Sequence, residues 1–388
     1  MEQQTGCDGL RVAIVGGGII GCLSALFLKK LGARPVILER GRTGHEASWA
    51  GAGILCPIHP WLYPDSFTHL VNYSLAMYPS LAFELKQSTG ISIECLQSGL
   101  LIPFFEDDVI DHRQSALQWS QKFDWLVKEL DAGQLQRSEP VLSEKASGGL
   151  LWPEVRQARN PRLLKSVRRA LEMASIEVHE GAEVSSLNEN PQGEIAGLSL
   201  ADGRKIDADA VLLAAGSWSG ELAQSMGISL PVEPVKGQIA LVKTEPGTVR
   251  HIIKHDDVYF VPRQDGRVLI GASMERVGFT EGNTEKILDS MMQAAARIAP
   301  GLETDEVEHQ WMGFRPGSPD GLPYLGPVEG RPGLWVATGH YRNGVLLAPG
   351  TAKLMSRWMM GVPPDLDMHD FRVDRPSEND AVIGLPAR

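Results

Sequence analysis

A glycine-rich turn near the start of the chain constrains the fold more than any other feature of the sequence. The turn, Gly16-x-Gly18-x-x-Gly21, follows a short apolar run at residues 10–15 that is rich in β-branched side chains. Such a run predicts a buried parallel strand, and the apolar segment after the turn predicts a helix. A second apolar run at residues 36–38 completes the pattern of a βαβ unit.

Each glycine of the turn has a distinct physical role in binding a dinucleotide. Gly16 permits the tight turn, Gly18 lets the backbone approach a pyrophosphate, and Gly21 lets the helix pack close to the sheet. The helix N-terminus offers unpaired N–H groups to phosphates. Glu39 can accept hydrogen bonds from both hydroxyls of an adenosine ribose. The sequence therefore predicts a dinucleotide site, although a turn that is glycine-rich for structural reasons alone is the alternative.

Length and charge narrow the class of protein. With 388 residues the chain is long enough for two domains, and 43% hydrophobic and 22% charged residues are typical of globular proteins. The formal net charge is -11, and the sequence contains no long run of like charges. Because a nucleic-acid backbone demands a basic face, we expect no nucleic-acid partner.

The cysteines and the apolar N-terminal region bear on the cellular compartment. Cys7, Cys22, Cys56 and Cys95 are scattered without a C-x-x-C pair, which predicts free thiols, a reducing compartment and no metal site. The apolar stretch at residues 12–28 is interrupted by glycines and lacks a basic leading segment. It is therefore a poor secretory signal and a poor membrane span. We expect a cytoplasmic protein without stable membrane insertion.

The rest of the chain alternates between two kinds of pattern. Buried strands at residues 208–215 and 334–338, and a helix from Gly344 to about residue 360, extend the first α/β unit. Between these pieces the pattern predicts an antiparallel sheet with strands at residues 99–104, 237–243, 258–262 and 268–271 beside helices near 68–88, 111–130 and 282–298.

We therefore expect an α/β protein of two interleaved domains. A Rossmann-type domain that binds the cofactor would comprise residues 1–90, 150–230 and 325–388. An antiparallel-sheet α+β domain that binds the substrate would comprise residues 91–149 and 231–324. The chain would leave the first domain, build the second, return, leave again and finish in the first.

Two further glycine-rich segments favour FAD over NAD as the dinucleotide. They are E-A-S-W-A-G-A-G at residues 46–53 and T-G-H-Y-R-N-G at residues 338–344. A flavin needs small residues and backbone amides where its ring lies against the chain. It also needs positive partial charge near N1 and the C2 carbonyl, which a helix that starts at Gly344 would provide. The alternative is a pair of ordinary glycine-rich loops.

Several motifs make the chain similar to a known family. They are V-A-I-V-G-G-G-I-I-G, P-V-K-G-Q, V-Y-F-V-P-R-Q-D-G-R, G-A-S-M-E, G-F-R-P-G-S-P-D-G-L-P-Y-L-G and G-H-Y-R-N-G-V-L-L-A-P-G-T. In this order they span residues 12 to about 351. The chain resembles the FAD-dependent D-amino acid oxidases and sarcosine oxidases, and among them the glycine oxidases of the thiamine-biosynthesis type.

The resemblance implies the residues of the substrate site. Arg315 matches the arginine that grips the substrate carboxylate, and Tyr259 matches the tyrosine that supports the same carboxylate. Arg342 matches an arginine beside the flavin that contacts the substrate through its backbone, and Met274 would line the pocket. A surface ion pair or a packed ring is the alternative for any such residue.

The resemblance also implies the residues that bind FAD. They are Gly16, Gly18, Ile19, Ile20, Gly21, Glu39, Arg40, Ala47, Ser48, Gly51, Gly53, Val184, Gly216, Trp218, Gly339, His340, Arg342, Asn343, Gly344, Val345 and Leu346.

The activity that the resemblance implies is the oxidation of glycine, other small amines or small D-amino acids. Hydride transfer from the α-carbon to flavin N5 requires a neutral amine, a rigid clamp and exclusion of water, but no strongly placed base. The imine would hydrolyse to an oxo acid and ammonia, and molecular oxygen would take the electrons to give hydrogen peroxide. A homo-oligomer and a role in thiamine synthesis are weaker implications.

Some features depart from the family pattern. Asp257 stands where related glycine oxidases tend to carry a histidine. His59, Trp61 and Tyr63 form either a lid over the flavin or the packing of the domain junction.

Three alternative functions stay open at the level of sequence. A D-amino acid dehydrogenase would pass electrons to a quinone, with the helix at residues 354–360 touching a membrane or packing on the sheet. A tRNA-modifying flavin oxidase module and a flavin-binding accessory protein without turnover are the others.

Overall fold

The glycine-rich turn joins two strands of a six-stranded sheet. The computed structural model describes residues 9–106, 108, 112–302 and 307–376. The strand order is β19-β20-β13-β1-β2-β9, and every pairing is parallel except that of β19 with β20. The strands expected at 10–15, 36–38, 208–215 and 334–338 are confirmed. The bounds are β1 Arg11–Val15, β2 Arg34–Glu39, β9 Glu177–Glu180, β13 Ala210–Leu213, β19 Tyr324–Pro327 and β20 Leu334–Thr338.

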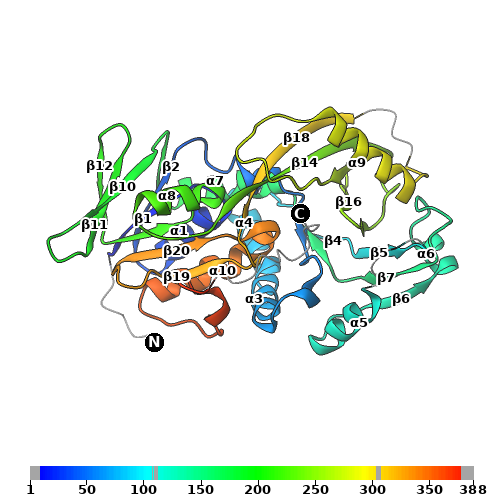
Figure 1. Cartoon of the computed structure of the whole chain (residues 1–388), viewed down its shortest axis with the longest axis horizontal. Helices are drawn as coiled ribbons and strands as arrows, with labels where there is room; N and C mark the ends of the chain where they lie inside the picture. Colours follow the sequence, from blue (N-terminus) through cyan, green and yellow to red (C-terminus); the bar gives the residue numbers. More distant parts are fainter. Residues whose placement is uncertain (1–8, 107, 109–111, 303–306, 377–388) are drawn as a thin grey trace.

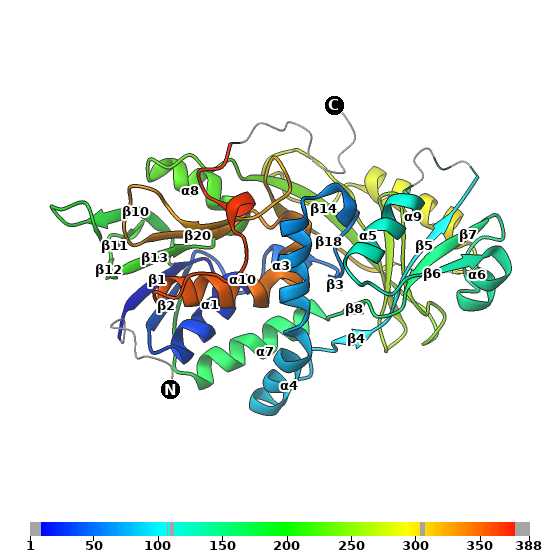
Figure 2. The same ribbon diagram turned by 90° about the horizontal axis from the view of Figure 1, so that it is seen from below.

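Both faces of this sheet are covered because its strands are apolar on both sides. In β1, Val12 and Ile14 enter one core, while Ala13 and Val15 enter another. Helices cover the first face, and an antiparallel meander with a short helix covers the second (Figures 1 and 2). The first set is α1 Ile19–Lys30, α3 Asp65–Leu75, α4 Tyr78–Thr89, α7 Asn160–Met173 and α10 Gly344–Met359. The second is β10 Val184–Glu189, β11 Ile195–Leu200, β12 Lys205–Asp207 and α8 Ser219–Ser225.

A second, eight-stranded sheet lies beside the first, on the right in Figure 1. Its order is β18-β14-β17-β16-β15-β5-β7-β6, antiparallel except between β15 and β5. The strands expected at 99–104, 237–243, 258–262 and 268–271 all belong to it. The bounds are β5 Leu100–Phe104, β6 Lys128–Asp131, β7 Gly148–Trp152, β14 Glu233–Lys243, β15 Ile252–His255, β16 Val258–Pro262, β17 Arg267–Gly271 and β18 Val307–Gly317.

Alternate side chains along these strands point to opposite faces of the sheet. One face packs against helices, and the other faces the first sheet and the candidate site. Ile253 and Phe260 face a core that includes α9 Glu285–Ile298 and α6 Ala132–Ser138. Ile252 and Tyr259 face the opposite way, into a core shared with the segment that follows α2 Ala47–Ala50. The period of two therefore directs Tyr259 toward the first sheet.

Short elements connect the two large sheets. A three-stranded sheet has the order β3-β8-β4, with bounds β3 Ile54–Leu55, β4 Leu96–Gln97 and β8 Arg156–Gln157. The 3₁₀ turns are η1 Pro60–Leu62, η2 Gly216–Trp218, η3 Tyr341–Asn343 and η4 His369–Phe371.

Two predicted helices were wrong in extent. The segment at 68–88 is two helices, α3 and α4, with Pro79 in the first turn of α4. Proline lacks an N–H group and fits best in a first turn, where that group would have no helical partner. The segment at 111–130 holds α5 Arg113–Lys122 and then strand β6. Helix α5 ends just before Asp124, which has φ 55 and turns the chain. The helix at 282–298 is confirmed as α9.

Strands of the two large sheets come from alternating parts of the chain, which supports the interleaved arrangement. The division into 1–90, 150–230 and 325–388 against 91–149 and 231–324 stays a prediction. Leu354, Met355 and Met359 of α10 are buried in the core beside α1, so this helix packs within the fold. Among the described residues, no helix is long and apolar enough to cross a membrane.

Candidate active site

A cavity of about 520 Å³ extends from the glycine-rich turn to the eight-stranded sheet. All four residues of the predicted substrate site line it. So do most of the predicted cofactor residues, namely Gly16, Gly18, Ile19, Ile20, Glu39, Arg40, Ala47, Ser48, Gly51, Gly53, Val184, Gly216, Trp218, His340, Arg342, Gly344, Val345 and Leu346. The structure therefore brings together residues that are more than 300 positions apart in the sequence.

Glu39, at the end of β2, stands at one end of this cavity. Its Oε2 accepts a hydrogen bond from the backbone N–H of Gly17 at 2.7 Å, and its Oε1 accepts one from Gly41 at 2.8 Å. The Arg40 guanidinium lies 3.9 Å from the ring centre of Trp218. An acidic group and a flat cation–aromatic pair thus frame the place where the sequence predicts an adenosine.

Two helix N-termini open into the same cavity. Helix α1 begins after Gly18 and α10 after Asn343, and within the described chain neither residue caps its helix with a side chain. Residues of both first turns line the cavity. Each end therefore presents backbone N–H groups and positive partial charge to whatever the cavity holds.

Small residues keep the wall of the cavity flat between these ends. Gly53 has φ 76, and a Cβ there would overlap the carbonyl oxygen of Ala158. A Cβ on Gly313 would come within 2.5 Å of the Cβ of Ala50. The backbone of segment 50–53 therefore lies directly against its neighbours and exposes its other side to the cavity.

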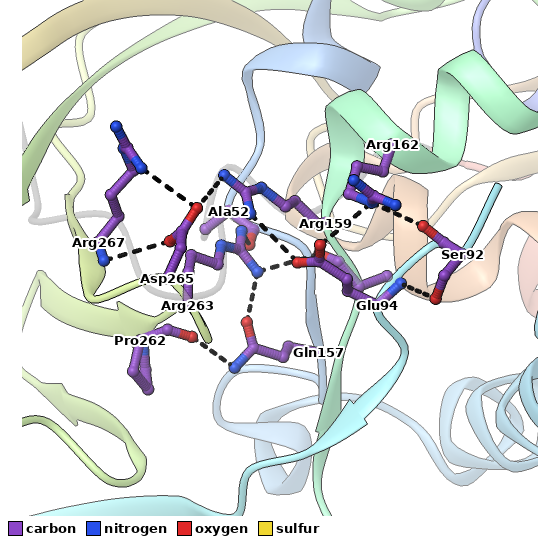
Figure 3. Close-up of polar contacts among 11 residues, drawn as sticks. Ala52, Ser92, Glu94, Gln157, Arg159, Arg162, Pro262, Arg263, Asp265 and Arg267 are labelled. Atoms are coloured by element: carbon purple, nitrogen blue, oxygen red, sulfur yellow. Dashed lines mark hydrogen bonds and ion pairs between the residues drawn. The ribbon is translucent and has the colours of Figure 1, made fainter. Parts of the chain in front are cut away.

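Buried polar side chains hold this segment in place. Arg263 is 6% exposed, and its Nη2 donates to the carbonyl oxygen of Ala52 at 2.7 Å, while its Nη1 donates to Gln157 (Figure 3). The same Nη1 also donates to the carbonyl oxygen of Ala158 at 3.3 Å. From the start of α7, Asn160 donates to the carbonyl oxygens of residues 48 and 51 at 2.9 and 2.8 Å. Burial lowers the pKa of Arg263 to about 10.

The network continues outward from Arg263. Arg159 bridges Glu94 and Asp265, with distances of 3.3 and 2.9 Å, and Arg267 also contacts Asp265 (Figure 3). Sequence reasoning missed Arg263, although it lies in the same V-Y-F-V-P-R motif as Tyr259. Its role depends on a contact across 211 residues, for which the motif gives no direct signal.

Arg315 and Tyr259 form a pair on the floor of the cavity. The guanidinium of Arg315, on β18, lies over Gly237 of β14 and donates to the carbonyl oxygen of Ser273 at 3.0 Å. The ring of Tyr259 lies over Gly271 of β17. The two side chains are close enough for each to shift the pKa of the other. Burial lowers the pKa of Arg315 and raises that of Tyr259, and each side chain partly offsets the shift of the other.

Other charged groups surround this pair. A terminal nitrogen of Arg342 contacts the sulfur of Met274, and the hydroxyl of Tyr341 lies 3.5 Å from the same sulfur. Asp257 and Lys254 both line the cavity. Burial lowers the pKa of Lys254 to about 8, an effect that Asp257 opposes and Arg342 strengthens. Sequence reasoning missed Lys254. Its only signal in the sequence was that it follows two apolar residues, Ile252 and Ile253, in a short strand.

Three predicted cofactor residues do not line the cavity. Gly21 packs α1 onto the turn, where a Cβ would overlap the carbonyl oxygen of Gly16. Gly339 has φ 74 and packs beside Tyr324, and Asn343 is buried as the N-cap of α10. Their positions suit structural support of the site.

Of the departures from the family pattern, Asp257 lines the main cavity, whereas His59, Trp61 and Tyr63 do not. His59 and Trp61 line a small adjoining cavity, and the His59 ring lies 4.9 Å from that of His112. Tyr63 stacks on Phe67 at 4.3 Å. Within the described residues, no group of three or more His, Cys, Asp or Glu could hold a metal ion. Cys22, Cys56 and Cys95 are free thiols, and Cys7 lies outside the described residues.

Comparison with known proteins gives one consistent result. A family model described as FAD dependent oxidoreductase matches residues 11–358. The glycine oxidase of Pseudomonas aeruginosa is 39% identical over 358 residues, which cover 92% of this chain and 96% of that protein. The crystal structure of glycine oxidase from Geobacillus kaustophilus superposes with a TM-score of 0.88 at 31% identity, covering 95% of this chain and 99% of that one. That of Bacillus cereus glycine oxidase gives 0.87 at 29%, with coverage of 95% and 99%.

Proposed function

The chain belongs to the family of FAD-dependent oxidoreductases, and from this premise we propose that it oxidises glycine and other small amines or D-amino acids with oxygen. The observation that carries the proposal is the Arg315–Tyr259 pair, which shares one cavity with the glycine-rich turn and two helix N-termini. FAD is the cofactor. For glycine the products would be glyoxylate, ammonia and hydrogen peroxide.

The residues present fit FAD. The start of α1 would bind the pyrophosphate, Glu39 the ribose, and the start of α10 the electron-rich edge of the flavin. Residues 50–53 are alternately alanine and glycine, so no side chain of this flat wall is larger than a methyl group. Such a wall suits a planar ring. Bound there, FAD supplies the two-electron acceptor that the amine oxidation requires.

Arg315 and Tyr259 would fix the substrate by its carboxylate. A guanidinium can form two parallel hydrogen bonds with a carboxylate, which sets the orientation of the α-carbon as well as its position. Arg342 and Lys254 add positive charge nearby. A neighbouring cation disfavours an ammonium ion, so these groups would help the substrate amine lose its proton before oxidation.

The acceptor and the compartment are part of the same proposal. The oxidases to which the chain is similar support oxygen as the electron acceptor and favour it over a quinone. They also favour oxidation of a small amine over modification of tRNA. The scattered cysteines support a reducing compartment, and we propose the cytoplasm.

The test is peroxide formation by the purified yellow protein in air with glycine, sarcosine, D-alanine, D-proline and L-alanine. We expect turnover of glycine or sarcosine and none of L-alanine. Arg315→Ala should raise KM steeply, because the charge that binds the carboxylate is lost. If none of these amines bleaches the flavin under anaerobic conditions, the proposed function is wrong.

A further inference from the structure

A buried lysine lies where the eight-stranded sheet closes the cavity. Lys254, on β15, is 6% exposed and lines both the main cavity and the small one beside it. In the antiparallel pair of β15 and β16 it stands directly opposite Tyr259. Residues in this register project from the same face of a sheet, so Lys254 and Tyr259 share the face that carries the substrate site.

The ammonium group of Lys254 has no close counter-ion within the described parts of the chain. None of the described carboxylates lies within 4 Å of its Nζ, and none of the described groups accepts a hydrogen bond from its side chain. Asp257 and Asp256, in the turn between β15 and β16, attract it only at longer range, and Arg342 repels it.

The other neighbours of Lys254 cannot neutralise it. Around the small cavity they are mainly apolar, and they include Cys56, Ile58 and Trp61. The pKa of His59 is lowered to about 3 by burial and by the charge of Lys254, so this ring is neutral near pH 7. A charge buried among such groups is costly unless a partner of opposite charge is present.

We propose that Lys254 binds a second carboxylate of the substrate, so that the site is suited to amines that carry two carboxylates. The inference rests on the proposed function, in which Arg315 binds the first carboxylate and the phosphates of FAD lie at the far end of the cavity. The substrate then supplies the anion that the protein does not place beside Lys254.

The order of strands places the two cationic side chains at different positions along one cavity. Arg315 on β18 and Lys254 on β15 are separated by four inter-strand steps in the sheet. At about 4.8 Å a step, the two backbones are about 19 Å apart. The guanidinium of Arg315 shortens this gap because it lies over Gly237 on the next strand, and Lys254 lines the same cavity.

The second carboxylate could be attached at either of two points. In iminodiacetate it is on the nitrogen substituent, and in D-aspartate it is on the side chain. The recognition by Lys254 is the same in both cases, and the two compounds distinguish the two points of attachment. Sarcosine and D-alanine are the matched substrates that lack the second carboxylate.

The test compares these four substrates on the flavin-loaded enzyme and on three variants. Lys254→Met removes the charge at similar length, and Lys254→Arg keeps it. Lys243→Met is the control, because Lys243 is exposed at the end of β14. We expect Lys254→Met to lower the ratio of kcat/KM for iminodiacetate over sarcosine, or for D-aspartate over D-alanine, by roughly 10- to 100-fold. Lys254→Arg should retain most of the ratio, and the control should retain all of it.

Binding of unreactive anions provides a readout that needs no turnover. Malonate has two carboxylates and acetate has one, and each can be titrated against the flavin absorbance. Malonate affinity should fall by roughly 10- to 100-fold in Lys254→Met, while the control variant keeps it. This measurement also applies if Lys254→Met lowers the activity toward every substrate.

Two results would overturn the proposal without touching the proposed function. In the first, the enzyme oxidises glycine, but Lys254→Met changes neither the ratios of kcat/KM between the paired substrates nor the affinity for malonate. The other is unchanged ratios with slower reoxidation of the flavin by oxygen for every substrate, which would assign Lys254 to the oxygen step. If no amine bleaches the flavin, the proposed function fails, and the malonate titration alone decides whether Lys254 binds an anion.

Discussion

Gly237 determines where the guanidinium of Arg315 can lie, and Gly237→Ala should therefore misplace the substrate. A Cβ at position 237 would be 2.5 Å from Cζ of Arg315 and closer still to both terminal nitrogens. Real Cβ atoms essentially never approach a neighbour more closely than 3.0 Å. The guanidinium must then move, and its hydrogen bond to Ser273 must lengthen or break.

The expected cost follows from the role of Arg315 as a clamp. A misplacement of about 1 Å in a positioning group can cost on the order of 100-fold in rate. We expect kcat/KM for glycine to fall roughly 10- to 100-fold, which equals about 1.4 to 2.8 kcal/mol. Gly237 does not have a positive φ, so alanine strains the backbone little there and the effect should be specific to Arg315.

The assay is steady-state peroxide formation by four proteins: wild type, Gly237→Ala, Arg315→Ala and the double variant. Gly133→Ala is the control, because Gly133 is exposed in α6 and a Cβ there meets only the ends of flexible side chains. If Gly237 acts through Arg315, the double variant should be little worse than Arg315→Ala alone. Equal losses in both backgrounds, or an unchanged kcat/KM in Gly237→Ala, would refute the reasoning.

Two further predictions concern the cofactor wall and the response to pH. Arg263→Met removes the donor to the carbonyl oxygen of Ala52, so the dissociation constant of FAD, measured by reconstitution of apoprotein, should rise about tenfold or more. Arg263→Lys should do less harm, and an unchanged constant in the Met variant would contradict the supporting role. Burial lowers the pKa of His340 to about 3, so the folded protein keeps this ring neutral while the unfolded chain protonates it below about pH 6.5. Stability should therefore fall as the pH drops from about 6.5 to 5, by roughly 1.4 kcal/mol per pH unit at most, in thermal unfolding. His340→Gln should flatten this slope, and equal slopes in both proteins would count against the assignment.

The parts of the site that depend on local geometry could be predicted from the sequence. Gly16, Gly18 and Glu39 belong to one βαβ unit, whose turn brings them together whatever the rest of the chain does. Arg315 and Tyr259 were predicted because their motifs carry a family resemblance, and the structure places both in the main cavity. That they bind substrate stays a prediction.

The parts that depend on the register between distant strands could not be predicted. Lys254 faces the cavity only because β15 pairs with β16 in one register, and a shift by one residue would direct it into the opposite core. The edge strand Lys128–Asp131 was missed for another reason. Its sequence is K-E-L-D, and three of its four residues are charged, so it lacks the apolar alternation typical of strands.

The interleaving of the two sheets has a consequence for synthesis of the protein. Strand β20 pairs with β13, and α10 packs beside α1, so the first sheet waits for residues near position 350 before its layers are complete. The start of α10 also forms part of the cavity wall. Most of the chain must therefore leave the ribosome before the flavin site is complete. A nascent chain stalled before residue 334 would lack α10, against which α1 packs.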